Sequence, residues 1–424
     1  MVHSPARLSS SVVSTAAFDR GRRRVLLGGP ALAGALAIAK PAQAQATRVW
    51  SAAWGCAPAG PPSSGMLSFS DQTLRLIVRP SVGGTRVRIR LSNEMGSSDL
   101  HIGRVTIAAR VGGAAIAAGS SRFFTFSGRS SITIPAGAPA VSDPVALPVT
   151  PFADLAISIY LPGSVQAATV HPSAYQANYA STAGDHCVTP TLPQQRAFAS
   201  WPFLTELDVN GGTPVLVAIG DSITDGAGST SSTNRRWTDW LARRAQAELG
   251  NDRLAVVNRG INGNRLLTDT PTTLQAGNDV LERFDRDVLA TGGVSALAFL
   301  IGINDICYSP PSNPIRPEAL FAGYLQLVER AHLHGITVLG TTLPPFYDFV
   351  YYTAARENVR QAVNAWMRSA QPFDALIDAD LALRDPASPL LLRSSYDSGD
   401  HLHPNDTGYQ ALADAVPMAV LTTL

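Results

Sequence analysis

The sequence is poor in cysteine and carries almost no excess of charge of either sign. Only three of its 424 residues are cysteines, too few for a disulfide framework. Lys and Arg number 33 and Asp and Glu number 32, which gives a formal net charge of +1 at pH 7. This balance gives no indication of nucleic acid or of an anionic membrane as a partner. The chain is 45% hydrophobic and 15% charged, so it can bury substantial cores, and its length fits two domains.

Several short motifs of enzymes and metal sites are also missing. The chain contains no G-x-S-x-G, which argues against the nucleophile elbow of an ordinary α/β-hydrolase. It contains neither H-E-x-x-H nor C-x-x-C, so the common zinc signatures are absent. We therefore expect no metal and no cofactor.

The first 46 residues have the pattern of a signal peptide. Arg22, Arg23 and Arg24 precede an apolar run at 25–39, and AQAQA at 42–46 offers A-x-A cleavage sites. The run is too short to span a bilayer comfortably, so export with cleavage is favoured over a stable membrane anchor. The consecutive arginines favour the twin-arginine route, while the Sec route stays open. We therefore expect a secreted or periplasmic protein.

Residues 47–207 form a block of short strand-like segments. Such patterns occupy LRLIV (Leu74–Val78), TRVRIRL (Thr85–Leu91), RVTIAAR (Arg104–Arg110), SITIP (Ser131–Pro135) and DLAISIYL (Asp154–Leu161). Several alternate in period two between Gly, Ser and Pro turns, and long helical patterns are absent. This predicts an all-β sandwich or a jelly-roll-like domain.

Two features of this block leave alternatives open. Arg86, Arg88 and Arg90 alternate with apolar residues, so we expect them on a solvent-facing side of a strand, with a ligand-binding stripe as the alternative. Cys56 and Cys187 lie near the two ends of the block. In an exported protein they could form a disulfide, which the sequence does not decide.

From Val215 onward, strand and helix patterns alternate. Strands are expected at 215–219, 254–257, 296–301, 336–341 and 375–378, and helices at 237–249, 281–289, 317–334, 354–369 and 404–420. This order predicts an α/β domain, a parallel sheet with helices on both faces. The breakers between Glu206 and Pro214 mark the boundary, so the second domain is expected at 214–424.

Four motifs with polar side chains lie at strand ends or in loops of this second block. They are G-D-S-I with Ser222, N-R-G-I-N-G-N-R at 258–265, G-I-N-D at 302–305 and D-H-L-H-P at 400–404. Open α/β sheets bind their ligands at the carboxyl ends of the strands. Asp400 and His403 are three residues apart, so one turn can bring the carboxylate to the imidazole Nδ1–H and leave Nε2 as a base. Each motif alone could equally be a turn or a cap.

Together and in this order, the motifs resemble the SGNH subgroup of the GDSL esterase/lipase family, over about the last half of the chain. The resemblance implies a three-layer, flavodoxin-like doubly wound sheet and a serine esterase. It assigns Ser222 as nucleophile, His403 as general base and Asp400 as the partner of His403. It assigns the oxyanion hole to Ser222, Gly263 and Asn304. Gly260 is a rival for Gly263, although the I-x-G spacing favours Gly263, and Ile223 replaces the leucine of the family name.

The residues then predict the chemistry better than the substrate. A base removes the serine proton as the hydroxyl attacks an ester, and fixed N–H donors stabilise the oxyanion. A β-rich block before such a domain also resembles the layout of some carbohydrate esterases, and the second half of the chain resembles the acetylxylan-esterase-like branch of the family. We therefore expect hydrolysis of small-molecule or polysaccharide esters, with short acyl groups such as acetyl on carbohydrate.

Several alternatives to this interpretation stay open. A short-chain lipase or general acylhydrolase and a serine peptidase would use the same residues, whereas a carbohydrate-binding protein would not need them. Asp400, His401 and His403 could also chelate a metal, but further ligands are not evident. The sequence does not indicate the oligomeric state.

Overall fold

The computed structural model describes residues 50–62, 64–269 and 275–424. The expected signal peptide at 1–46 lies outside these residues. These described residues belong to one compact unit, and its β-rich and α/β segments share one continuous apolar core. The expected partition into domains at 47–207 and 214–424 stays a prediction.

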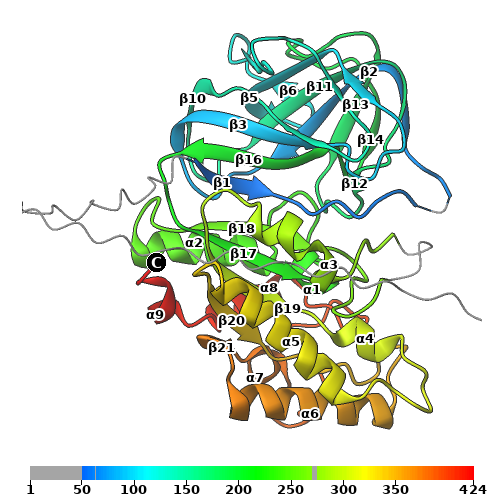
Figure 1. Cartoon of the computed structure of the whole chain (residues 1–424), viewed down its shortest axis with the longest axis vertical. Coiled ribbons are helices and arrows are strands. Elements are labelled where there is room, and N and C mark those ends of the chain that lie inside the picture. Colours follow the sequence, from blue (N-terminus) through cyan, green and yellow to red (C-terminus); the bar gives the residue numbers. More distant parts are fainter. Residues whose placement is uncertain (1–49, 63, 270–274) are drawn as a thin grey trace, which may run out of the picture. The chain divides into compact units, whose positions relative to one another are not determined.

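The β-rich segment contains two main antiparallel sheets (Figure 1). The first has the order β1-β16-β3-β10, with β9 beside β3; its strands are β1 (Trp50–Gly55), β16 (Leu204–Asn210), β3 (Gly84–Ser92), β10 (Val145–Val149) and β9 (Pro139–Val141). The second has the order β14-β13-β2-β11-β5-β6, with β7 beside β5; its strands are β14 (Gln194–Phe198), β13 (Asn178–Ala183), β2 (Ser68–Val78), β11 (Leu155–Gln166), β5 (Arg104–Gly112), β6 (Ala115–Ile116) and β7 (Arg122–Phe123). Two short ribbons pair β12 (Val170–His171) with β15 (Trp201–Pro202) and β4 (Leu100–Ile102) with β8 (Ile132–Ile134).

Alternating side chains of the two sheets build a common core. Leu74 and Leu76 of β2 and Val87 and Ile89 of β3 are fully buried in the same cluster, as period-two strands with one apolar face require. The strand-rich prediction for this segment is confirmed. Its finer assignment as a jelly roll stays a prediction.

The interpretation of the arginines on β3 as solvent-facing was only partly right. Arg86 is exposed, but Arg88 pairs with Asp208 at 2.7 Å. Arg90 pairs with Glu206 at 3.4 Å and donates to the backbone oxygen of Ala290 in the α/β segment. Two of these arginines therefore neutralise acidic groups on the neighbouring strand β16, which period-two patterning alone does not reveal.

All three cysteines lie within the described residues and are free and buried. The thiol of Cys56 donates to the backbone oxygen of Leu204, and that of Cys187 lies near the backbone oxygen of Arg104. The disulfide between Cys56 and Cys187 that the sequence left open is therefore not formed.

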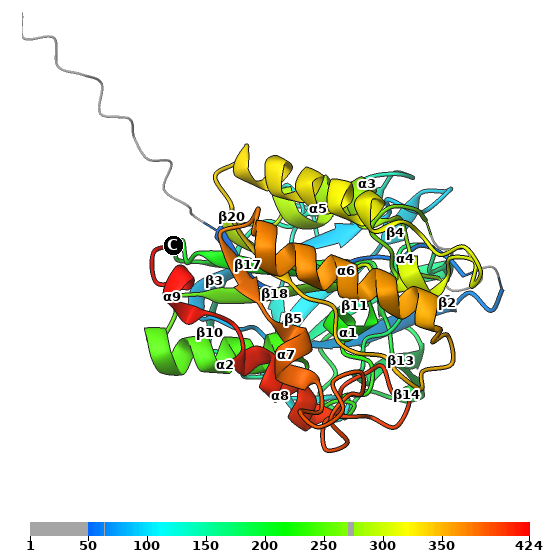
Figure 2. The same ribbon diagram turned by 90° about the horizontal axis from the view of Figure 1, so that it is seen from below.

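The α/β segment is built on a five-stranded parallel sheet in the order β18-β17-β19-β20-β21. The strands are β17 (Val215–Gly220), β18 (Ala255–Gly260), β19 (Val294–Leu300), β20 (Thr337–Thr341) and β21 (Ala375–Ile377). In sequence order this is 2-1-3-4-5, the flavodoxin-like arrangement. Figure 2 shows α5 (Pro317–His332) and α6 (Ala354–Ala370) on one face of the sheet and α2 (Trp237–Leu249) and α8 (Asp406–Asp414) on the other. The predicted doubly wound parallel sheet is confirmed.

The remaining helices are α1 (Ser222–Asp225), α3 (Val280–Phe284), α4 (Ile303–Cys307), α7 (Ala379–Leu383) and α9 (Met418–Leu421). Two of the expected helices differ from the observed ones. The helix expected at 404–420 is divided into α8 and α9, because Pro417 lacks an N–H and clashes with a preceding turn. The helix expected at 281–289 is α3 followed by a π-helical turn at Asp285–Leu289.

Within 50–62, 64–269 and 275–424, every helix is too short or too polar to cross a bilayer.

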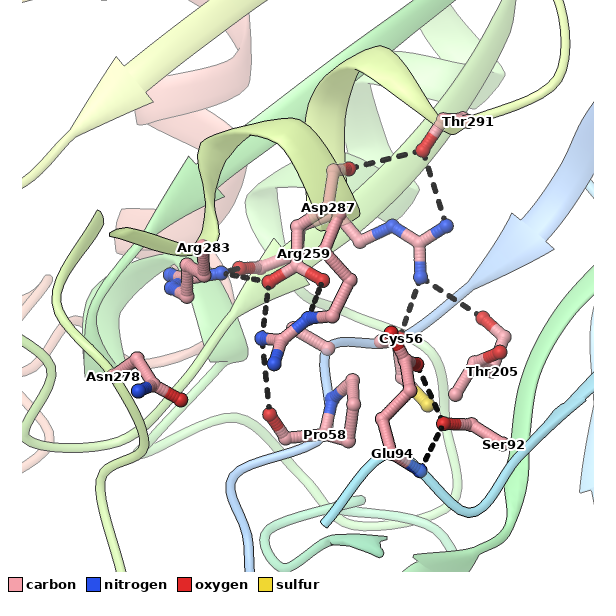
Figure 3. Close-up of polar contacts among 12 residues, drawn as sticks. Cys56, Pro58, Ser92, Glu94, Thr205, Arg259, Asn278, Arg283, Asp287 and Thr291 are labelled. Carbon is pink, nitrogen blue, oxygen red and sulfur yellow. Dashed lines mark hydrogen bonds and ion pairs between the residues drawn. The ribbon is translucent and has the colours of Figure 1, made fainter. Parts of the chain in front are cut away.

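Buried charges join the two segments at β18, and Figure 3 shows Arg259 of this strand with its contacts to Cys56, Thr205 and Thr291. The guanidinium of Arg259 forms an ion pair with Glu206 of β16, and the two side chains are only 2% and 0% exposed. Arg259 also donates to the backbone oxygens of Cys56 and Thr205 and to the hydroxyl of Thr291. Both terminal nitrogens of the guanidinium thus find acceptors, whereas the buried Nε has none. The pair fixes the end of β18, from which the loop at 261–264 continues, against the β-rich segment.

Candidate active site

Ser222 lies where the parallel sheet presents its carboxyl edge. It is the first residue of α1 and directly follows β17 and Asp221. The Asp221 carboxylate caps the helix by accepting the backbone N–H of Ile223 at 3.0 Å. Ser222 is 7% exposed. The strand-to-helix turn therefore holds the hydroxyl in a fixed place at the sheet edge.

His403 and Asp400 approach Ser222 from the loop before α8. The imidazole Nε2 lies 2.7 Å from the Ser222 Oγ, and Nδ1 lies 2.5 Å from Asp400 Oδ2. Asp400 Oδ1 also accepts the backbone N–H groups of Leu402 and His403, at 3.0 and 2.8 Å. Partial burial alone would raise the pKa of Asp400, but the His403 hydrogen bond and charge hold that pKa well below its usual range. An ionised Asp400 keeps the proton on Nδ1 and leaves Nε2 to face the serine.

The serine, the histidine and the two other predicted oxyanion donors line one cavity of about 240 Å³. Its lining consists of Ser222, Ala227, Asn262, Gly263, Asn304, Tyr308, Phe349, Leu402 and His403. Asn304 is 6% exposed and stands in the first turn of α4, just after β19. The structure thus brings together all five residues that the sequence singled out, with Asp400 bonded to His403 at the rim.

The structure also distinguishes between Gly260 and Gly263, the two candidates for the second oxyanion donor. A Cβ on Gly260 would lie 2.2 Å from the backbone nitrogen of Asp225, so Gly260 allows close packing of β18 on α1. Gly263 has φ +73° and lines the cavity, a conformation that favours glycine. The position of Gly263 suits the proposed donor better than that of Gly260.

Comparison with known proteins agrees with this geometry. A model of the GDSL-like lipase/acylhydrolase family matches residues 218–411. This part of the chain is a GDSL-like lipase/acylhydrolase domain. No curated protein matches the chain.

Solved structures similar to the chain cover about half of it. An acetyl xylan esterase, AlAXEase, is 19% identical and covers 49% of this chain and 99% of its own, with a TM-score of 0.38. An aryl esterase from M. smegmatis is 18% identical and covers 50% and 100%, with a TM-score of 0.38. A variant of an acetyl xylan esterase from Geobacillus stearothermophilus is 19% identical and covers 50% and 97%, with a TM-score of 0.37. Likenesses at this level do not bear on the substrate.

In the loop of the GDSL-like domain that contains Asp400, His401 and His403, the three side chains do not converge as metal ligands. His401 pairs through Nδ1 with Asp397 at 2.7 Å, whereas Asp400 pairs with His403. Among the described residues, the acidic and histidine side chains whose ligand atoms converge are Asp269, Asp279 and Glu282. That group contains none of the predicted site residues.

Two buried carboxyl groups of the GDSL-like domain were not singled out from the sequence. Burial raises the pKa of Asp221 to about 7 and that of Asp305 to about 6. Asp305 accepts the backbone N–H groups of Leu266 and Leu267, at 2.8 and 3.1 Å. It therefore holds the chain just beyond the 258–265 motif against α4. Its place in G-I-N-D was the only available signal.

A second set of residues near the site, which the sequence motifs did not predict, lies between α1 and the β-rich segment. Asp225, at the end of α1, lies 3.0 Å from His171 Nε2 and accepts the backbone N–H of Asn262 at 3.0 Å. Asn262 stands beside Gly263 in the I-N-G-N motif, so its position could have drawn attention. His171 belongs to β12, far away in the sequence, and carried no local signal.

Proposed function

We propose that the protein is an exported serine esterase that removes short acyl groups, such as acetyl, from carbohydrate. The observation that carries the esterase mechanism is the chain of contacts from Asp400 through His403 to Ser222. This chain ends in a cavity that is also lined by Gly263 and Asn304. A nucleophile, a base held in one tautomer and amide groups beside them are what acyl transfer requires.

In the proposed reaction, His403 Nε2 takes the Ser222 proton while Oγ attacks the carbonyl carbon of the ester. The carbonyl oxygen becomes an oxyanion, and its donors are the backbone N–H groups of Ser222 and Gly263 and the amide of Asn304. One such donor is typically worth about 3 kcal/mol in the transition state. The bond to the alcohol then breaks, and His403 gives its proton to the leaving oxygen. Water, deprotonated by the same imidazole, releases the acyl group from Ser222.

A neighbouring aromatic surface supports an alcohol with a ring. Tyr308 lines the catalytic cavity and also a second cavity of about 470 Å³, together with Tyr351 and Tyr352. The rings of Tyr308 and Tyr351 lie 5.2 Å apart, and Tyr351 is 40% exposed. Tyrosine faces pack against apolar ring surfaces while their hydroxyls stay available for hydrogen bonds, a combination that suits a sugar ring.

The apolar part of the catalytic cavity supports a second candidate, a short-chain acylhydrolase with broad alcohol tolerance. Phe349 and Leu402 line the cavity beside Ser222, and they would pack against a short apolar acyl chain as readily as against an acetyl methyl group. The two candidates differ in the alcohol of the ester: the first prefers a carbohydrate, whereas the second accepts many alcohols.

A hydrolysis panel distinguishes them. Acetylated sugars, acetylated xylan and p-nitrophenyl esters of increasing chain length are compared, with Ser222→Ala as the matched inactive control. We expect acetyl esters of carbohydrate to give the highest kcat/KM, and Ser222→Ala to lose activity by several orders of magnitude while keeping its melting temperature. A preference for longer p-nitrophenyl esters would favour the acylhydrolase. Full activity of Ser222→Ala would remove the serine mechanism.

The export part of the proposal is supported by the three arginines at 22–24, the apolar run and the A-x-A sites at 42–46. We expect the mature chain to begin near Gln45 or Thr47 and to be found outside the cytoplasm. N-terminal sequencing of the fractionated protein tests this. Recovery of the whole protein from the cytosol with Met1 intact would contradict it.

A further inference from the structure

The Asn262 side chain is held by the β-rich segment. Its amide nitrogen donates to the Ser173 hydroxyl at 2.9 Å and to the Tyr175 hydroxyl at 2.7 Å. A carboxamide has two N–H hydrogens, and both are used by residues just after β12. We call residues 171–175 the β12 arm. Since Gly263 follows Asn262 directly, the arm holds the residue beside a proposed oxyanion donor.

The same arm also holds α1. His171 Nε2 lies 3.0 Å from Asp225 Oδ1, and His171 Nδ1 lies 2.8 Å from the backbone oxygen of Ala57. A carbonyl or carboxylate oxygen can only accept, so both ring nitrogens carry hydrogen and His171 is an imidazolium. Burial alone would lower the pKa of His171, but the Asp225 charge raises it above its usual value. His171 and Asp225 are both nearly inaccessible, and they form a buried ion pair.

Asp225 connects the two contacts. Its Oδ1 faces His171, and its Oδ2 accepts the backbone N–H of Asn262 at 3.0 Å. Asp225 lies three residues after Ser222 on the one-turn helix α1. The β12 arm is therefore bonded to the helix that carries the nucleophile and to the loop that carries Gly263.

We propose that the β12 arm is a positioning element of the catalytic site, which fixes the Asn262–Gly263 loop relative to Ser222. The inference rests on the proposed esterase function and gives the β-rich segment a direct part in it. A displacement of about 1 Å between reacting groups can lower a rate by about 100-fold, so two hydrogen bonds and an ion pair at this place can control kcat. Tyr175, Ser173, His171 and Asn262 act as positioning residues, since they work through the loop and α1.

Tyr175→Phe tests the arm with the smallest change. It removes the hydroxyl that accepts from Asn262 and keeps the ring. We expect kcat on p-nitrophenyl acetate to fall roughly tenfold with little change in KM. The affinity for a boronic acid that mimics the tetrahedral intermediate should fall by the same factor. Tyr160→Phe is the matched control, because it removes a Tyr hydroxyl that donates to Asp71 elsewhere in the β-rich segment; it should leave kcat unchanged.

A merely structural arm would give a different result. In that case Tyr175→Phe would lower the melting temperature and spare both kcat and boronic acid affinity, which overturns the proposal. Ser173→Ala provides a second variant if Tyr175→Phe fails to fold, with the same expected loss of kcat. In an Asn262→Ala background, Tyr175→Phe should cause no further loss, because its effect passes through Asn262. An additive loss would also overturn the proposal.

Failure of the esterase function itself is recognised separately. If wild-type protein hydrolyses none of the esters and Ser222 is not labelled by a fluorophosphonate, the proposed function fails. If the wild type is active and labelled while Tyr175→Phe and Ser173→Ala keep full kcat, only the role of the β12 arm fails.

Discussion

The amide nitrogen of Asn304 donates to the backbone oxygen of Asn264 at 3.0 Å. This bond uses one amide hydrogen and fixes the plane of the carboxamide, while the residue lines the cavity beside Ser222. Asn304→Ala should therefore lower kcat by about 10²–10³-fold with little change in KM, because the lost donor acts in the transition state. Asn313→Ala, in an exposed loop, is the control. An Asn304→Ala enzyme with unchanged kcat and a lower melting temperature would show that Asn304 only supports the strand end.

The Asp400→Asn variant should lose activity in a different way from Asn304→Ala. The ionised carboxylate holds His403 in one tautomer and stabilises its imidazolium, so its replacement should lower kcat strongly. Part of the loss should return at high pH, where hydroxide helps to deprotonate the serine. The pH profile of kcat measures this. Asp397→Asn breaks an Asp–His pair of the same kind at His401, and a loss as large and as pH-dependent there would contradict the assignment.

Asp221 should make stability depend on pH. Its pKa of about 7 in the folded protein is above the usual 3.8 because of burial, so the folded state binds its proton more tightly than the unfolded state. Its contribution to the free energy of unfolding is therefore present at low pH and lost as pH rises through about 7. Relative to Asp221→Asn, the wild type should lose roughly 3 kcal/mol between pH 5 and pH 8. Urea unfolding of both proteins at the two pH values measures this, and parallel behaviour would contradict the raised pKa.

The buried pair of Arg259 and Glu206 should be far more sensitive than a surface pair. Glu206→Gln leaves a buried guanidinium without its full counter-charge, and we expect a loss of about 3–5 kcal/mol in the free energy of unfolding. Glu318→Gln is the matched control, since Glu318 and Arg316 are 67% and 85% exposed and 3.9 Å apart. That variant should change stability by less than about 1 kcal/mol. Equal effects of the two variants in chemical unfolding would contradict this reasoning.

Local patterns were enough to predict the five parallel strands and the long helices of the α/β segment. The helix at 237–249 has the expected bounds, because its apolar spacing runs unbroken to Gly250. The five parallel strands were predicted because each is a short apolar run between breakers. Three of the motifs place Ser222, Gly263 and Asn304 just after predicted strands. The fourth places Asp400 and His403 in a loop before the last helix, and the structure brings all five residues together.

The contacts between segments could not be predicted. His171 meets Asp225 across 54 residues of sequence, and Arg259 meets Glu206 across 53. Such pairs depend on how one sheet packs against another, which hydrophobic periodicity does not encode. For the same reason the sequence pattern predicted Arg88 and Arg90 to face solvent, although each forms an ion pair with an acidic residue of β16.

The three buried thiols bear on whether the described residues need a disulfide to fold. Burial raises the pKa of Cys307 to about 12 and those of Cys56 and Cys187 even further, so almost no thiolate forms near neutral pH and oxidation is slow. Residues 50–62, 64–269 and 275–424 are held together without any covalent cross-link. Disulfide formation is therefore no part of the folding of these residues.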